Sequence, residues 1–170
     1  MAGLVVPYPG SHGKSRLAAM GTGRERIALA MLADVVTDPG GGQGAAVEAA
    51  LAAGEERPAL VVNADLPAAT PRDLLSLLGA MPPQGMAIVE ARDGTTNALA
   101  LSAPHLFSPL YGPGSAERFR EHAARLGIEL VVADIPNLVA DVDLPRDLAR
   151  LDGSLGAHTQ AILSAAPVAP

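Results

Sequence analysis

Short runs of apolar residues alternate with longer segments of helical periodicity along most of the chain. The runs predict strands over residues 3–7, 60–63, 86–91, 98–101, 128–133 and 138–142. Most of these runs are continuous rather than alternating, which is typical of strands that are covered on both faces. The alternation with helical segments therefore predicts an α/β fold, a single three-layer Rossmann-like domain with a mostly parallel sheet.

Helices are predicted where Ala and Leu recur at helical spacing or where capping residues precede such a segment. Their ranges are 24–34, 45–53, 71–79, 115–126 and 145–151. Before the third range stands Thr70, followed by Pro71 and Asp73, a combination that favours a helix start. Ser115 is the expected cap of the fourth range, and Gly127 is its expected terminator.

Residues 1–165 are expected to form one domain, because neither a repeat nor a linker is visible among them. The remaining segment, 166–170, contains two prolines and is expected to fray. The first nine residues lack the basic run of a secretory signal, and no apolar run reaches the roughly 18 residues that a membrane span requires. These features predict a cytoplasmic protein that does not enter a membrane.

Composition narrows the classes of function. With 49% hydrophobic and 18% charged residues, the chain is able to bury a sizeable core. A net charge of −6 and only two Tyr and two Phe argue against nucleic acid as a partner. The absence of Cys excludes disulfides, iron–sulfur clusters, thiolate zinc sites and a Cys nucleophile.

The first candidate site is a loop that follows the strand predicted over residues 3–7. It runs from Pro7 to Arg16 and contains Lys14, the only lysine among 12 basic residues. Backbone amides of such a loop, together with Lys14 and Arg16, are suited to a triphosphate. The loop is not a P-loop, because Tyr8 stands where that motif requires Gly. A solvated turn with two exposed cations remains the alternative.

The second candidate site consists of aspartates at the ends of two predicted strands. Asp65 follows strand 60–63, while Asp141 lies near the end of strand 138–142 and Asp143 directly follows that strand. Ligands of open parallel sheets bind at the carboxyl ends of the strands, and alternation places Asp141 and Asp143 on the same side. A few carboxylates suit Mg²⁺, which takes substrate phosphates as its remaining ligands. The alternative is that an Asp before Pro only caps a helix.

The third candidate site combines Thr96 and Asn97 with Gly112 and Ser115. Hydroxyls, an amide and the first amides of the helix predicted from Ser115 are suited to a small phosphorylated acid. A turn followed by an ordinary helix cap remains the alternative. The four histidines form no metal-ligand pattern, and no nucleophile-elbow motif is present.

Six motifs in order resemble the guanylyltransferases that activate phosphoenolpyruvate or 2-phospho-L-lactate in coenzyme F-420 biosynthesis. They are Lys14-Ser15-Arg16-Leu17, the glycine loop 38–42, Ala64-Asp65-Leu66-Pro67, the segment 93–99, Tyr111-Gly112-Pro113-Gly114-Ser115 and Asp141-Val142-Asp143-Leu144-Pro145. The resemblance extends over residues 3–151 and implies a nucleotidyltransferase of GT-A-like fold. It implies that GMP is transferred from GTP to the acid with release of pyrophosphate.

The resemblance also implies roles for individual residues. Asp65 and Asp141, with Asp143 beside them, would hold Mg²⁺, and Thr96, Gly112 and Ser115, with Asn97, would bind the acid. Pro7, Lys14, Ser15, Arg16 and Gly42 would bind the nucleotide, and Lys14, Arg16, Asp65 and Asp141 would carry the catalysis.

The chain departs from the family pattern on the nucleotide side. A strand–helix–strand segment that family members usually carry is missing after Val36, and Gly42-Gln43-Gly44 stands where the family usually has Gly-Leu-Asn. Two alternatives therefore stay open: a shortened paralogue that binds a phosphorylated acid without catalysis, and another sugar or cofactor nucleotidyltransferase. The choice of acid and the presence of a homodimer also stay open.

Overall fold

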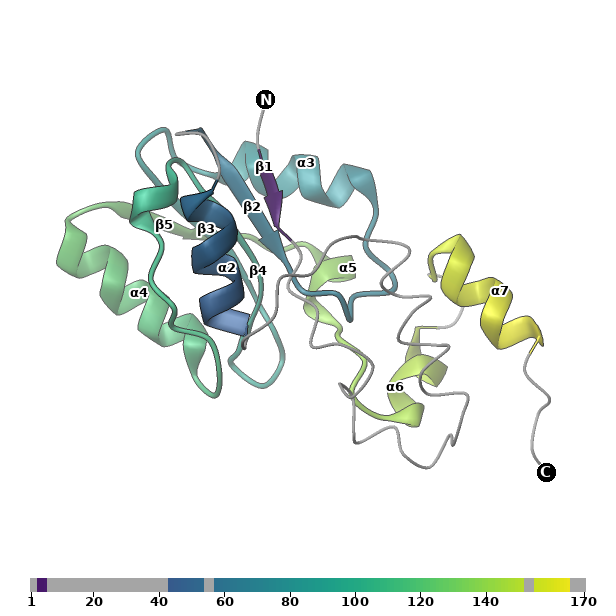
Figure 1. The fold of residues 1–170 in the computed structure, drawn as a ribbon. Coiled ribbons are helices and arrows are strands. Elements are labelled where there is room, and N and C mark those ends of the chain that lie inside the picture. Colours follow the sequence, from purple (N-terminus) through teal and green to yellow (C-terminus); the bar gives the residue numbers. More distant parts are fainter. Residues whose placement is uncertain (1–2, 6–42, 54–56, 152–154, 166–170) are drawn as a thin grey trace.

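The computed structural model describes residues 3–5, 43–53, 57–151 and 155–165 (Figure 1). The helix predicted over 24–34 and the tail 166–170 lie outside these residues. Within the described residues, five strands form one sheet of order β1-β2-β4-β3-β5. The strands are β1 (Gly3–Val5), β2 (Ala59–Val62), β3 (Gly85–Glu90), β4 (Thr96–Leu101) and β5 (Glu129–Val132). The assignment of residues 1–165 to one domain stays a prediction.

The sheet is mixed, so the prediction of a mostly parallel sheet was wrong. β1 pairs with β2 and β3 with β5 in parallel, whereas β4 is antiparallel to both β2 and β3. The cause is a tight turn, in which the Ala91 amide donates to the Thr95 carbonyl at 2.9 Å and Gly94 has a φ of +81°. A connection this short joins only antiparallel neighbours, because a parallel crossover needs a dozen or more residues.

Helices surround the sheet. They are α2 (Gln43–Ala52), α3 (Pro71–Ala80), α4 (Ser115–Leu126), α5 (Pro136–Val139), α6 (Pro145–Arg150) and α7 (Ala157–Ala165), with a short 3₁₀ helix η2 (Pro104–Leu106). The predicted ranges of α2, α3, α4 and α6 are confirmed to within two residues at each end. The sequence analysis predicted no helix at α7. None of the helices in the described part of the chain is long and apolar enough to span a membrane.

The strand predicted over residues 138–142 was wrong. This segment begins as the last half of α5 and continues as irregular chain up to α6. Pro136 occupies the start of α5, and the Leu138 amide donates to the Ile135 carbonyl at 2.9 Å. A short apolar run fits a buried helical turn as well as a strand, so periodicity alone does not separate the two.

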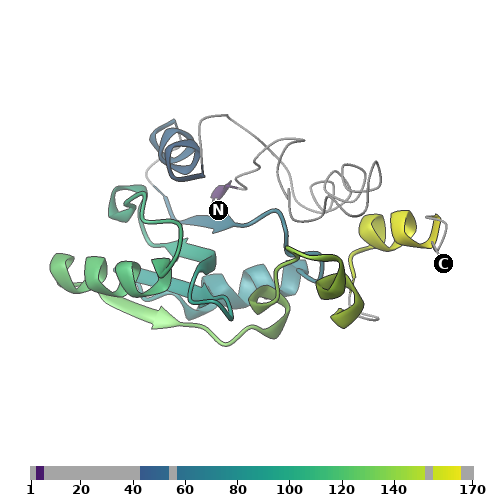
Figure 2. The ribbon, with the colours of Figure 1, turned by 90° about the horizontal axis from the view of Figure 1, so that it is seen from below.

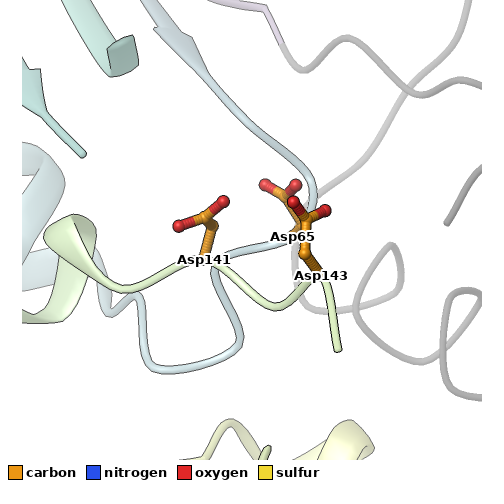
Figure 3. Close-up of side chains that lie close together, drawn as sticks. All are labelled: Asp65, Asp141 and Asp143. Carbon is orange, nitrogen blue, oxygen red and sulfur yellow. The ribbon is translucent and has the colours of Figure 1, made fainter. Parts of the chain in front are cut away.

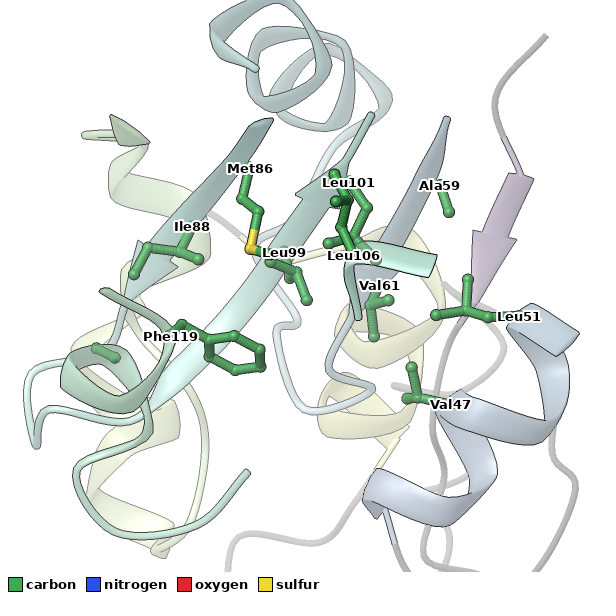
Figure 4. Packing of buried hydrophobic residues seen from close by; sticks show 11 residues of the cluster. Val47, Leu51, Ala59, Val61, Met86, Ile88, Leu99, Leu101, Leu106 and Phe119 are labelled. Atoms are coloured by element: carbon green, nitrogen blue, oxygen red, sulfur yellow. The ribbon is translucent and has the colours of Figure 1, made fainter. Parts of the chain in front are cut away.

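Apolar side chains cover the sheet on both faces. On one face, α2 and α4 contribute Val47, Leu51 and Phe119 to a cluster with residues of β2, β3 and β4 (Figure 4). On the other face, Leu77 of α3 and Leu138 of α5 pack against the alternate strand residues. In both ribbon views, α6 and α7 lie at the opposite end of the molecule from α4 (Figures 1 and 2).

The start of α3 is a reciprocal cap, as the sequence predicts. The Asp73 amide donates to Thr70 Oγ1 at 3.3 Å, and the Thr70 amide donates to Asp73 Oδ2 at 2.8 Å. Asn137 of α5 donates to the same carboxylate oxygen at 3.1 Å. Partial burial opposes ionisation of Asp73, but these hydrogen bonds outweigh it and lower its pKa below the ordinary 3.8.

We expect Asp73→Ala to lower the free energy of unfolding by about 1 kcal/mol at neutral pH, because a helix cap is lost. The pKa of Asp73 is lower in the folded chain than in the unfolded chain. The stabilisation that Asp73 provides is therefore complete above pH 3.8, and it is lost as the pH falls through the lower pKa that Asp73 has in the folded chain. Urea unfolding of both proteins across this range measures the difference, and a difference that stays unchanged at acid pH would contradict the assignment.

Candidate functional site

Three carboxylates from two separate chain segments meet at one edge of the sheet. Asp65 lies in the loop after β2, and Asp141 and Asp143 lie between α5 and α6 (Figure 3). Each residue offers one carboxylate oxygen, and these three oxygens all lie within 4.8 Å of one another. The structure thus brings together the aspartates that the sequence analysis selected.

Backbone contacts hold the two segments against each other. The Val142 amide donates to the Asp65 carbonyl at 3.1 Å, and the Val142 side chain is fully buried. The residues on either side of Val142 are half-buried, so Asp141 and Asp143 share the opposite side of the chain. Asp147 of α6 accepts hydrogen bonds from the Asp143 and Leu144 amides at 3.3 and 2.8 Å, which fixes the far end of the segment.

The donor set of this cluster fits a hard divalent cation. Such ions prefer carboxylate oxygens at about 2.0–2.6 Å, so oxygens on opposite sides of one ion are about 4–5 Å apart. The separations among Asp65, Asp141 and Asp143 are within that span. All three residues are half-buried, and one carboxylate oxygen of Asp65 is buried from solvent. The cluster is thus able to bind a metal ion.

A buried hydroxyl pair lies at the N-terminus of α4. The Ser115 hydroxyl donates to Thr96 Oγ1 at 3.2 Å, and both residues are buried. Ser115 was predicted to cap α4, but the capping residue is Gly114 with a φ of +69°. The Ser115 and Ala116 amides already donate to the carbonyls of Gly112 and Gly94, at 3.0 and 3.2 Å. These two amides are therefore already bonded within the protein.

Arg118 fixes the loop that contains Gly112. Its guanidinium donates to the Leu110 carbonyl at 3.1 and 2.7 Å, to the Tyr111 carbonyl at 3.0 Å and to the Pro113 carbonyl. Gly112 has a φ of +109°, a conformation that side-chain-bearing residues rarely adopt. The planar fork of Arg binds several carbonyls at once, which the single ammonium of Lys does not reproduce.

Asn97 lies on β4, with its side chain directed at α5, and is only 2% exposed. Its side-chain amide donates to the carbonyls of Leu138 and Val139 at 3.1 and 3.2 Å. It also accepts a hydrogen bond from Asn63 at 3.4 Å, and Asn63 accepts one from Gln43 at 2.6 Å. Both amide hydrogens of Asn97 are thus directed at the backbone of the segment that continues to Asp141.

The residues predicted to bind the nucleotide, Pro7, Lys14, Ser15, Arg16 and Gly42, lie outside the described residues. β1 pairs with β2 in parallel, with Val5 opposite Val61. Because this pairing is parallel, both strands run toward the edge of the sheet at which Asp65 lies. The departure at Gly44, where the resemblance would predict Asn, has a local reason. A Cβ on Gly44 would lie 2.8 Å from Cβ of Pro109, so this chain has no room there for Asn.

Sequence reasoning missed Arg118 and Asn63. Arg118 lies in the first turn of α4, where the helix dipole disfavours a cation, and that misplaced charge was an available signal. Asn63 directly precedes Ala64-Asp65, and only the antiparallel pairing of β2 with β4 places it beside Asn97. The sequence analysis did not predict that pairing.

Comparison with known proteins points to one family. Residues 38–163 match the family described as guanylyl transferase CofC like. The chain is 40% identical over 96 residues to a phosphoenolpyruvate guanylyltransferase of Rubrobacter xylanophilus, covering 55% of this chain and 46% of that protein. It is 40% identical over 85 residues to a 2-phospho-L-lactate guanylyltransferase of Natrialba magadii, covering 50% of this chain and 36% of that protein.

The chain thus matches less than half the length of these curated relatives. Among solved structures, it is similar to a provisionally identified nucleotide-diphospho-sugar transferase from Desulfovibrio desulfuricans G20. The TM-score is 0.70 at 15% identity, over 96% of this chain and 95% of that one. At this identity the likeness concerns the fold alone.

Proposed function

Since the chain belongs to the CofC-like guanylyl transferase family, we propose that it transfers GMP from GTP to a small phosphorylated acid. The acid is phosphoenolpyruvate or 2-phospho-L-lactate, pyrophosphate is released, and the product serves coenzyme F-420 biosynthesis. The observation that carries the proposal is the meeting of Asp65, Asp141 and Asp143 within 4.8 Å at one edge of the sheet. The fold is accordingly proposed to be that of a GT-A-like nucleotidyltransferase.

The proposed reaction is an in-line displacement at the α-phosphorus of GTP. A phosphate oxygen of the acid forms the new P–O bond, and the bond to the bridging oxygen of pyrophosphate breaks. Bound Mg²⁺, held by Asp65, Asp141 and Asp143, would supply positive charge for the phosphate oxygens. No protein nucleophile is required, so the side chains contribute by positioning the two substrates.

Two parts of the site would position the substrates. Thr96 and Ser115 offer hydroxyls beside Gly112, in a loop that Arg118 fixes, and these groups are proposed to bind the acid. Lys14 and Arg16, with Pro7, Ser15 and Gly42, are proposed to bind the phosphates of GTP. The side chain of Asn97 is directed at the backbone of α5, so a different role is proposed for it below.

The test is pyrophosphate release from GTP, measured with phosphoenolpyruvate and with 2-phospho-L-lactate, in the presence of Mg²⁺. We expect release with GTP and at least one of the two acids, and at least about tenfold less with ATP, CTP or UTP. Release with a phosphosugar instead would indicate another nucleotidyltransferase. Calorimetry that detects binding of the acid but no binding of GTP or Mg²⁺ would contradict the proposal and favour a non-catalytic binding protein.

A further inference from the structure

Three amide side chains form a connected row, from α2 through the residue after β2 to β4. Gln43 donates to Asn63 at 2.6 Å, Asn63 donates to Oδ1 of Asn97 at 3.4 Å, and Asn97 donates to two carbonyls of α5. Asn63 also donates to the Thr96 carbonyl at 3.4 Å. Because Oδ1 of Asn97 accepts from Asn63, the orientation of the Asn97 amide is set, with both hydrogens on the side of α5.

Those two carbonyls belong to the last turn of a helix of only four residues. Terminal carbonyls of a helix have no partner within it, so a side-chain donor fixes where the chain leaves the helix. Leu138 and Val139 are the last two residues of α5, and Asp141 follows two positions later. The next anchor is the Val142 amide, which donates to the Asp65 carbonyl. Asp141 is therefore held between Asn97 on one side and the Asp65 loop on the other.

We propose that Asn97 is a positioning residue for the divalent cation. By holding the end of α5, it keeps Asp141 and Asp143 facing Asp65 before the ion binds. The inference rests on the metal site of the proposed function, and it assigns Asn97 no contact with substrate.

Electrostatics gives the reason why such a residue is needed. Three carboxylates within 4.8 Å repel one another when no cation neutralises them. Without the hydrogen bonds from Asn97, the segment that contains Asp141 would relax so that Asp141 moves away from Asp65. Bringing the carboxylates together again would cost free energy, and this cost would reduce the affinity for the ion. Groups that hold metal ligands in place typically change metal affinity 10–100-fold when they are removed.

The experiment is a titration of the protein with Mn²⁺, followed by electron paramagnetic resonance of the free ion, without GTP or acid. Asn97→Leu keeps the number and branching of the side-chain heavy atoms but donates no hydrogen bond, and we expect its Kd for Mn²⁺ to rise at least about tenfold. The matched control is Asn137→Leu, which removes a hydrogen bond to Asp73 from the same helix. Its Kd should stay within about twofold of that of the unsubstituted chain, because Asn137 is not one of the groups proposed to hold the metal ligands in place.

An unchanged Kd for Asn97→Leu, or an equal rise in both variants, would overturn the inference. If Asn97→Leu does not fold, Asn63→Ala replaces it, because that variant leaves both donations of Asn97 in place but frees its orientation. Its Kd should rise severalfold, and an unchanged value would again overturn the inference.

The titration also separates this inference from the proposed function. Mn²⁺ binding that Asp65→Asn abolishes and Asn97→Leu weakens, in a chain that releases no pyrophosphate, would refute the transferase and leave the role of Asn97 standing. A chain that releases pyrophosphate but binds Mn²⁺ equally well with and without Asn97 would support the transferase and overturn the role of Asn97.

Discussion

Replacing Asp65 or Asp141 by Asn is expected to reduce pyrophosphate release at least about 100-fold. The reason is that a metal cation contributes several kcal/mol to stabilising the transition state of a phosphoryl or nucleotidyl transfer. Each substitution removes one negative charge from a cluster whose three oxygens lie within 4.8 Å. The amide keeps the size of the side chain, so the fold should be retained. Initial rates at saturating GTP and acid, together with thermal unfolding of each variant, measure the effect.

The matched control for these variants is Asp134→Asn. Asp134 is an exposed aspartate in the loop between β5 and α5 and does not belong to the cluster. Its substitution should leave the rate within about twofold, since most surface changes have small effects. Rates of Asp65→Asn and Asp141→Asn that matched this control would rule out the aspartates as the site of the chemistry.

Phe119→Ala is expected to lower the free energy of unfolding by about 3–5 kcal/mol, because it leaves a large cavity in a close-packed core. Phe119 is 0% exposed, and its ring contacts that of Tyr111 at a centroid distance of 5.6 Å and an angle of 73°. It belongs to the cluster that joins α4 to the sheet (Figure 4). A domain of this size is stable by only about 5–15 kcal/mol, so the loss is severe. Urea unfolding monitored by circular dichroism measures it.

Leu75→Ala is the control for this prediction. Leu75 lies on α3 and is 68% exposed, so its substitution leaves no cavity and should change the free energy of unfolding by at most about 0.5 kcal/mol. A Phe119→Ala protein as stable as Leu75→Ala would mean that α4 is not held to the sheet as described. Because Ser115 and Arg118 are both on α4, the same variant should weaken acid binding.

Local signals in the sequence predicted most single elements. The cap at Thr70 and the glycine stop at Gly127 are each encoded within one helical turn, and the structure has both. The apolar runs predicted β1 to β5, because a run of this kind is also a local signal of a few consecutive residues. The signals failed at residues 138–142, where a four-residue helix and a strand have the same apolar pattern.

Strand direction was also within reach of the sequence. An Asp-Gly pair between two apolar runs is a hairpin signal, and Asp93-Gly94 stands between β3 and β4. Oδ1 of Asp93 accepts hydrogen bonds from the amide and hydroxyl of Thr95, at 3.0 and 2.6 Å, which closes the turn. The prediction of a mostly parallel sheet was drawn from the alternation of apolar runs with helical segments and did not use this turn.

The sequence by itself determined which residues are candidates for the chemistry, because carboxylates, hydroxyls and glycines at strand and helix ends are visible as residue types in order. Only the tertiary structure decided how they are held. The row from Gln43 through Asn63 to Asn97, and the fork of Arg118 on loop carbonyls, join residues whose partners lie on other elements. Contacts of this kind depend on strand order and on backbone groups that every residue shares, so no local pattern of side chains records them.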